Sequence, residues 1–60
     1  MAWLAVDKDG TEMIFESKPS RGEKYWIGRG KGSFIKLSSG TAIKINGGRK
    51  LSWTDEPIKC

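Results

Sequence analysis

The chain contains no histidine and a single cysteine, Cys60, among its 60 residues. The absence of histidine removes the commonest general base at neutral pH and the commonest zinc ligand. One cysteine cannot form a disulfide within the chain or complete a tetrahedral Cys/His metal site, and as a nucleophile it would need an activating base. We therefore expect a protein that is not an enzyme, with no catalytic residue, no metal site and no cofactor.

Long apolar runs are also absent. Runs such as Trp3 to Val6 are far shorter than the ~20 residues that a transmembrane helix needs. The N-terminus lacks the basic, apolar and small-residue pattern of a signal peptide, and a lone cysteine fits a reducing compartment. We expect a cytoplasmic protein with no membrane partner.

The length predicts one small domain, residues 1–60. A chain of this size buries only about 60% of the surface that its unfolded form exposes, so the quality of the core matters. Apolar residues are spread along the whole chain and include three tryptophans, and each large aromatic can bury roughly 150–250 Å². The composition therefore predicts a folded chain rather than a disordered one.

The net charge of +4 is unevenly distributed. Residues 1–20 hold two cations and four acids, and residues 51–60 hold one cation and two acids. Residues 21–50 hold eight cations and one acid, a net charge of +7. Such asymmetry indicates an anionic partner, although it can equally serve solubility.

Residues 3–16 carry the strongest local signal, that of a β-hairpin. Two apolar segments flank the sequence Asp-Lys-Asp-Gly at positions 7–10, which suits a type I turn with Gly10 at positive φ. That register pairs Trp3 with Phe15 and Ala5 with Met13. Both faces of the hairpin are then partly apolar, so either it is covered on both sides or one face is a binding surface.

The middle of the chain predicts a second hairpin. Residues 17–24 form a polar loop broken by Pro19 and Gly22, which is followed by a short strand at 25–27, a glycine-rich turn at 28–32 and a strand at 33–37. Two hairpins in succession indicate an antiparallel meander. Residues 55–57 are expected to end regular structure before a short tail.

Residues 38–48 allow two interpretations. As a helix, the segment would begin with a serine cap and end at Gly47 in the left-handed conformation. As a strand, Thr41, Ile43 and Ile45 alternate, and the Asn-Gly pair at 46–47 is a strong turn into residues 49–53, with Leu51 and Trp53 on one face. The local pattern slightly favours the strand.

Cations and aromatic residues alternate in the basic middle. This composition is typical of single-stranded nucleic-acid binders, in which bases stack on rings and cations follow the phosphates. Backbone N–H groups of the glycine-rich turn could also contact phosphates, although the segment lacks the spacing of a P-loop. A tryptophan in a strand of so small a domain is more often part of the core. The candidate binding residues are Lys24, Tyr25, Trp26, Arg29 and Lys31, joined by Arg49 and Lys50 if the two turns lie at the same end.

Two blocks resemble a family of small uncharacterised proteins of phages and prophages of gut bacteria. These blocks are WLAVDKDGTE at residues 3–12 and LSWTDEPI at residues 51–58, and with the segments beside them they cover more than half the chain. The resemblance implies a mobile-element setting in a bacterial host and no assigned activity. Relatives have a longer apolar pattern after the Gly-Thr pair at 40–41, and this favours a short helix at about residues 39–46.

The predicted fold is a small α+β domain, with an antiparallel sheet of three to four strands and one short helix. The alternative is an all-β small barrel of five short strands. We expect a phage-like accessory protein acting by protein–protein interaction, for example as an inhibitor of a host defence nuclease or ribonucleoprotein. The alternatives are a basic module binding single-stranded RNA or DNA, and a structural component of a larger assembly. The expected oligomeric state is a monomer or a weak homodimer.

Overall fold

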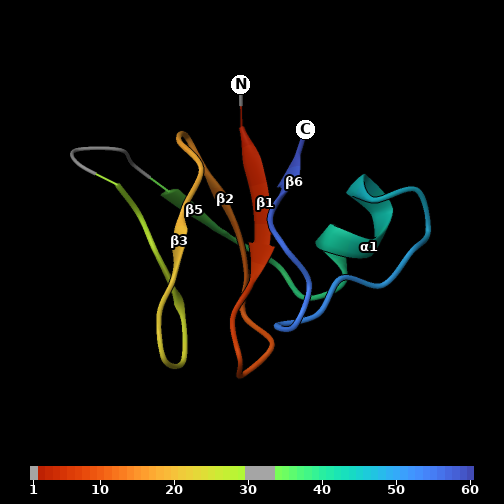
Figure 1. Ribbon diagram of the computed structural model, residues 1–60. Coiled ribbons are helices and arrows are strands. Elements are labelled where there is room, and N and C mark those ends of the chain that lie inside the picture. The colour runs from red at the N-terminus through yellow and green to blue at the C-terminus, as the bar shows by residue number, and fades with distance from the viewer. Residues whose placement is uncertain (1, 30–33) are drawn as a thin grey trace.

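The computed structural model describes residues 2–29 and 34–60 (Figure 1). It shows a small α+β fold with a four-stranded antiparallel sheet in the order β5-β2-β1-β6, a two-stranded sheet β3-β4 and one short helix. The predicted fold class is confirmed, and the alternative of a closed barrel is wrong. The elements are β1 (Trp3–Val6), β2 (Glu12–Phe15), β3 (Ser20–Arg21), β4 (Trp26–Ile27), β5 (Phe34–Leu37), α1 (Thr41–Ile45) and β6 (Ile58–Lys59).

The β1–β2 hairpin forms in the predicted register, with Trp3 opposite Phe15 and Ala5 opposite Met13. Its turn is closed by the Gly10 N–H, which donates to the Asp7 carbonyl over 2.9 Å. Gly10 has a φ of 94°, a conformation that side chains with a Cβ rarely adopt. Residues 7–10 therefore form the turn by local interactions, and the turn determines the register of β1 and β2.

Alternate side chains of a strand point to opposite faces. Both faces of this hairpin carry buried side chains. Figure 1 shows α1 and the β3–β4 hairpin on opposite sides of the β1–β2 hairpin. We call the two sets of buried residues the helix-side core and the hairpin-side core. The helix-side core consists of Leu4, Val6, Ala42 and Leu51. The hairpin-side core consists of Ala5, Met13, Phe15 and Trp26, with Trp3 and Trp53 packed against it.

The ambiguous segment is a helix, which confirms the interpretation that followed from the resemblance. The expected serine cap is wrong: Gly40 precedes α1 and has no side chain to cap it, so the cap comes from elsewhere in the chain. The carboxylate of Glu12 accepts hydrogen bonds from the Gly40 N–H over 3.0 Å and from the Ala42 N–H over 2.7 Å. Gly47, with a φ of 68°, lies in the left-handed conformation predicted for the stop. The Glu12 carboxylate, 30 residues away in sequence from Ala42, thus accepts hydrogen bonds from N–H groups at the start of α1 that have no partner within the helix.

Three expectations about pairing are wrong. Residues 17–24 are not loop throughout, since Arg21 of β3 pairs with Trp26 of β4. β5 pairs with β2 instead of forming a hairpin with β4, because Phe34 packs on Phe15 with ring centroids 5.5 Å apart. The tail is not irregular, since Ile58 of β6 pairs with β1.

The strand alternative for residues 49–53 is also wrong. Leu51 belongs to the helix-side core and Trp53 packs against the hairpin-side core, so they do not share a face. The cause is that residues 49–53 form a bent connection rather than a strand.

Within residues 2–29 and 34–60, no helix has the length and apolar character needed to span a membrane.

The Glu12 cap gives a prediction about stability. Hydrogen bonds from Ala42 and then Gly40 hold the pKa of Glu12 below its usual range. Stability from this group is therefore present above the pKa of the unfolded chain and is lost as pH falls through the folded value. We expect Glu12→Ala to lower the free energy of unfolding at pH 7 by about 0.5–2 kcal/mol, as for other lost caps.

Urea unfolding followed by tryptophan fluorescence at pH 7 and at about pH 3 measures this effect. The difference between wild type and Glu12→Ala should shrink at the lower pH. Glu16→Ala is the control, because Glu16 is exposed just beyond the same strand. An equal loss from both variants would contradict the role of Glu12 as a cap.

Candidate functional site

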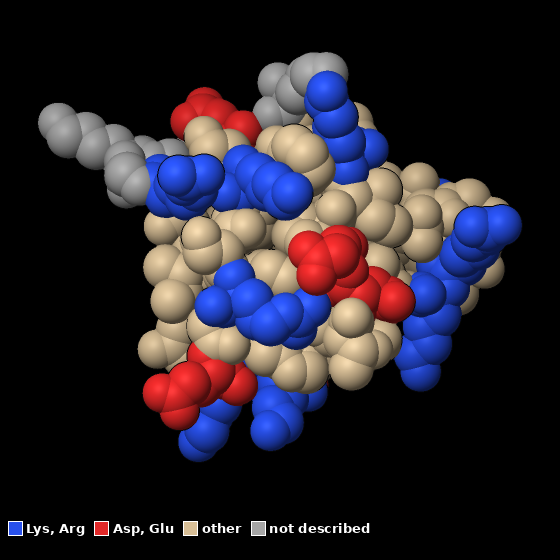
Figure 2. Space-filling model, viewed as in Figure 1, with Lys and Arg blue, Asp and Glu red and all other residues tan. Residues whose placement is uncertain are grey.

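The predicted basic and aromatic residues fall into two separate groups. Lys24, Tyr25 and Arg29 belong to the β3–β4 hairpin and the segment after it, whereas Arg49 and Lys50 follow α1 on the other side of the molecule (Figure 1). Lys31 and the glycine-rich turn at 30–32 lie outside the described residues. Figure 2 shows that cations are spread over the face seen in Figure 1, with acidic groups between them. Among the described residues, the segment from Lys24 to Arg29 is therefore not brought together with Arg49 and Lys50.

Trp26 is buried, with 5% of its surface exposed, and it anchors the β3–β4 hairpin. Its backbone N–H donates to Oδ1 of Asp7 over 2.9 Å, and its indole Nε1–H donates to the Val6 carbonyl over 2.9 Å. The Lys8 N–H donates to the Lys24 carbonyl over 3.0 Å. Three hydrogen bonds thus join the hairpin to the end of β1, and Trp26 is not available for stacking on a base.

Arg21 ties the same hairpin to the C-terminal segment. Its guanidinium lies 4.4 Å from the ring centroid of Trp26 and 4.7 Å from that of Trp53, within the range of a cation–π contact. It also donates to the Trp53 carbonyl over 2.7 Å and pairs with Glu56 at 3.8 Å. This cluster has no local sequence signal, because nothing in the sequence around Arg21 shows that it meets a residue 32 positions away.

The outer edge of β5 is one of the two edges of the main sheet. β5 lies at the end of the strand order, and within the described residues no strand pairs with its outer side. Phe34 is 56% exposed and Ile35 is 66% exposed. These two side chains project from opposite faces of the strand, so apolar surface borders the free edge on both sides.

A hollow of about 320 Å³ adjoins this edge on the hairpin side. Its lining combines Met13, Phe15 and Phe34 of the main sheet with Tyr25 and Ile27 of the hairpin. Tyr25 is 59% exposed and Ile27 is 49% exposed, so the apolar surface continues from the edge onto the hairpin. We call the set Tyr25, Ile27, Phe34, Ile35 and Lys36 the edge site.

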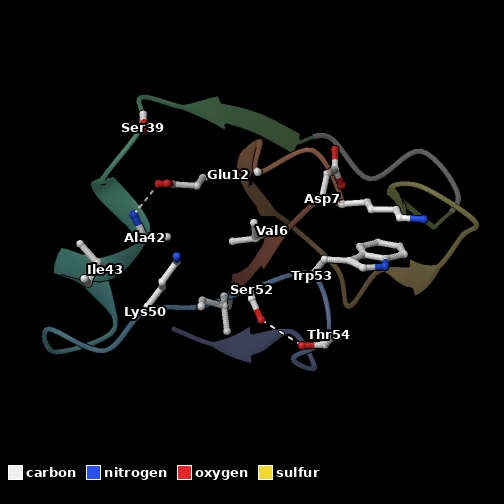
Figure 3. Close-up of a pocket in the computed structure, with 13 residues that line it drawn as sticks. Val6, Asp7, Glu12, Ser39, Ala42, Ile43, Lys50, Ser52, Trp53 and Thr54 are labelled. Carbon is white, nitrogen blue, oxygen red and sulfur yellow. Dashed lines mark hydrogen bonds between the residues drawn. The ribbon is translucent and has the colours of Figure 1, made fainter.

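A second hollow, of about 420 Å³, lies between the β1–β2 turn, α1 and residues 50–54. Figure 3 shows polar groups around it that already serve the fold. Glu12 caps α1, Asp7 holds Trp26, and the Ser52 hydroxyl lies 3.0 Å from that of Thr54. No buried side-chain N or O atom lacks a partner in the described part of the chain. This hollow therefore presents little that would select a ligand.

The described residues also hold no group of three or more acidic or cysteine side chains placed to bind a metal ion. What the edge site offers instead is the outer side of β5, with which no strand of the described residues pairs, and apolar surface on each side of it. Such an arrangement supports binding by main-chain hydrogen bonds and side-chain packing.

The buried Asp7 carboxylate, on which the hairpin depends, gives a prediction. Burial raises its pKa and the Asp9 charge adds to this, while the hydrogen bond from Trp26 opposes it. Because the pKa of Asp7 is higher in the folded than in the unfolded chain, the folded state holds the carboxyl proton more tightly. The free energy of unfolding therefore falls as pH rises through the pKa of the folded state. Asp7→Asn keeps an acceptor oxygen without the charge, whereas Asp7→Ala leaves the buried Trp26 N–H unpaired, at a cost of about 1–3 kcal/mol.

Urea unfolding of the three proteins at about pH 3 and pH 7 separates these effects. Asp7→Asn should match or exceed wild type at pH 7 and lose that advantage at pH 3, while Asp7→Ala should be the least stable of the three. An Asp7→Asn variant that unfolds as readily as Asp7→Ala would show that the charge itself is required.

No protein-family model, curated protein or solved structure significantly matches the chain. The function is therefore inferred from the geometry of the edge site.

Proposed function

We propose that the chain is a non-enzymatic interaction module that binds an extended segment of a partner protein along the free edge of β5. One observation carries the proposal: an edge strand with two large apolar side chains, Phe34 and Ile35, each more than half exposed. An extended segment added there would gain main-chain hydrogen bonds, and its side chains would pack on the exposed apolar surface.

The edge of β5 lacks most of the features by which proteins block unwanted strand pairing. Edges are commonly protected by proline, bulges, several charges or a covering element. β5 contains no proline and pairs with β2 residue for residue from Phe34 to Leu37, so it has no bulge. Its single charge is Lys36. Since alternate residues point their backbone groups outward, a four-residue strand can offer about four hydrogen bonds to a ligand.

The sequence-based hypotheses differ in how well they agree with this site. An accessory protein that inhibits a host defence nuclease or ribonucleoprotein and a component of a larger assembly would both be served by strand addition, and both stay predictions. Binding of single-stranded nucleic acid is less well supported, because Trp26 is buried and the cations are dispersed. Lys24, Tyr25 and Arg29 are the described residues on which that alternative rests.

Selection of displayed peptides against the purified chain tests the proposal. Selected peptides should perturb the backbone amide NMR signals of β5 and make its outward amides exchange more slowly. Ile35→Lys places a second cation on the edge and should weaken binding by about tenfold or more. The matched control is Ile45→Lys, which changes an isoleucine of α1 that is 41% exposed and should have little effect.

Perturbations confined to α1 or to the hollow of Figure 3 would contradict the proposal, as would equal weakening by both variants. The nucleic-acid alternative is tested with fluorescent single-stranded RNA, single-stranded DNA and duplex DNA at ~50 and ~200 mM salt. Salt-sensitive binding to one of these, with no peptide selected, would replace strand addition with that alternative.

A further inference from the structure

We propose that the segment received by β5 is acidic, with the order apolar, acidic, apolar, aromatic from its N-terminus when it runs antiparallel to β5. This inference rests on the proposed function and specifies the chemistry of the partner at the same site.

The first step concerns charge. Residues 24–29 and 34–37, which supply the edge site, carry three cations, Lys24, Arg29 and Lys36, and no acidic residue. Lys36 is exposed on β5 itself, and Lys24 and Arg29 are exposed on the hairpin side. Within the described residues, Arg21 and Glu56 form the one ion pair with an N–O distance below 4 Å. Lys36 therefore has no carboxylate within that distance among these residues. A carboxylate brought to this edge would meet the exposed ammonium group of Lys36.

The field of Lys36 already acts on one carboxylate of the chain. Hydrogen bonds from Thr11 chiefly hold the pKa of Asp9 below its usual range, and the charge of Lys36 lowers it further. A partner carboxylate opposite Lys36 would lie within reach of the ammonium group, since directly paired residues have Cβ atoms about 4.5–5.5 Å apart.

The second step concerns register. Phe34 and Lys36 share the hairpin-side face, because they pair with Phe15 and Met13. Ile35 shares the other face with Ile14. A residue directly opposite another on an added strand projects from the same face. The partner should therefore place an acidic residue opposite Lys36 and an aromatic one opposite Phe34, beside the apolar hollow, with apolar residues opposite Ile35 and Leu37.

A second copy of this chain fits the edge less well. Two copies would each bring a net charge of +4, and a twofold axis at Lys36 would set two lysines opposite each other, which is destabilising. An antiparallel arrangement of the partner is chosen because antiparallel pairs are more common and β5 already pairs in that way with β2.

Three synthetic peptides of about eight residues, a usual strand length, test the inference. They share one sequence apart from the core, which is Val-Glu-Val-Phe, Val-Gln-Val-Phe or Val-Lys-Val-Phe. Fluorescence anisotropy with the full chain should rank them in the order Glu, Gln, Lys, with about tenfold between the first and the last. Lys36→Glu should reverse this order. The matched control Lys59→Glu makes the same charge change on the same sheet face at the opposite edge and should leave the order unchanged.

The outcomes separate the two proposals. Binding of all three peptides at β5 with equal affinity would overturn the acidic preference and leave strand addition standing. An order that Lys59→Glu reverses as well as Lys36→Glu would also overturn it, because the preference would then reflect net charge alone. Absence of binding by every peptide, with self-association in sedimentation experiments, would identify a second copy as the occupant and contradict the inference.

Discussion

The hydrogen bond from the Trp26 backbone N–H to the buried Asp7 carboxylate holds the molecule in its observed arrangement. It is a charge-assisted bond at the end of β1, and the indole of the same tryptophan donates to Val6 beside it. Together they seat the β3–β4 hairpin over one face of the β1–β2 hairpin. Without them, the hairpin-side core would lose its central aromatic residue, and Arg21 would lose one of the two rings that flank it.

The position of the hairpin in turn determines what remains open. A chain of 60 residues has little material with which to cover a sheet. Here α1, held by Glu12, covers one face, and the β3–β4 hairpin covers the other. β6 pairs along β1, so that side of the sheet is partly closed. The edge of β5 is left with exposed apolar side chains, and the hairpin adds Tyr25 and Ile27 to the same surface.

Local chemistry explains which parts of the fold could be predicted. The Asp-Lys-Asp-Gly turn and the apolar alternation around it specify the first hairpin and its register without help from the rest of the chain. By contrast, the local sequence of residues 41–45 is compatible with a strand or a helix. The start of the helix is capped by the carboxylate of Glu12 on β2, far away in the sequence. β3 and β6 were missed because two-residue strands have no periodicity. They exist because β4 and β1 supply partners for them.

The candidate site shows the same division. Sequence alternation of cations and aromatics drew attention to residues 24–29, but it could not distinguish a buried ring from an exposed one. Trp26 is held by Asp7 and Arg21, whereas Tyr25 next to it is 59% exposed. The edge of β5 had no sequence signal, because a strand becomes an edge through the order in which strands pair, and that order depends on contacts far apart in the chain.

The free edge of β5 is the central claim, and hydrogen exchange of its backbone amides in the unbound protein tests it most directly. In an antiparallel edge strand, alternate amides point toward the neighbouring strand and toward solvent. The four β5 amides should therefore alternate between slow and rapid exchange, two of each, at protein concentrations where sedimentation shows a monomer. Slow exchange of all four under those conditions would show that the edge is already occupied within the chain, and would contradict strand addition as the basis of function.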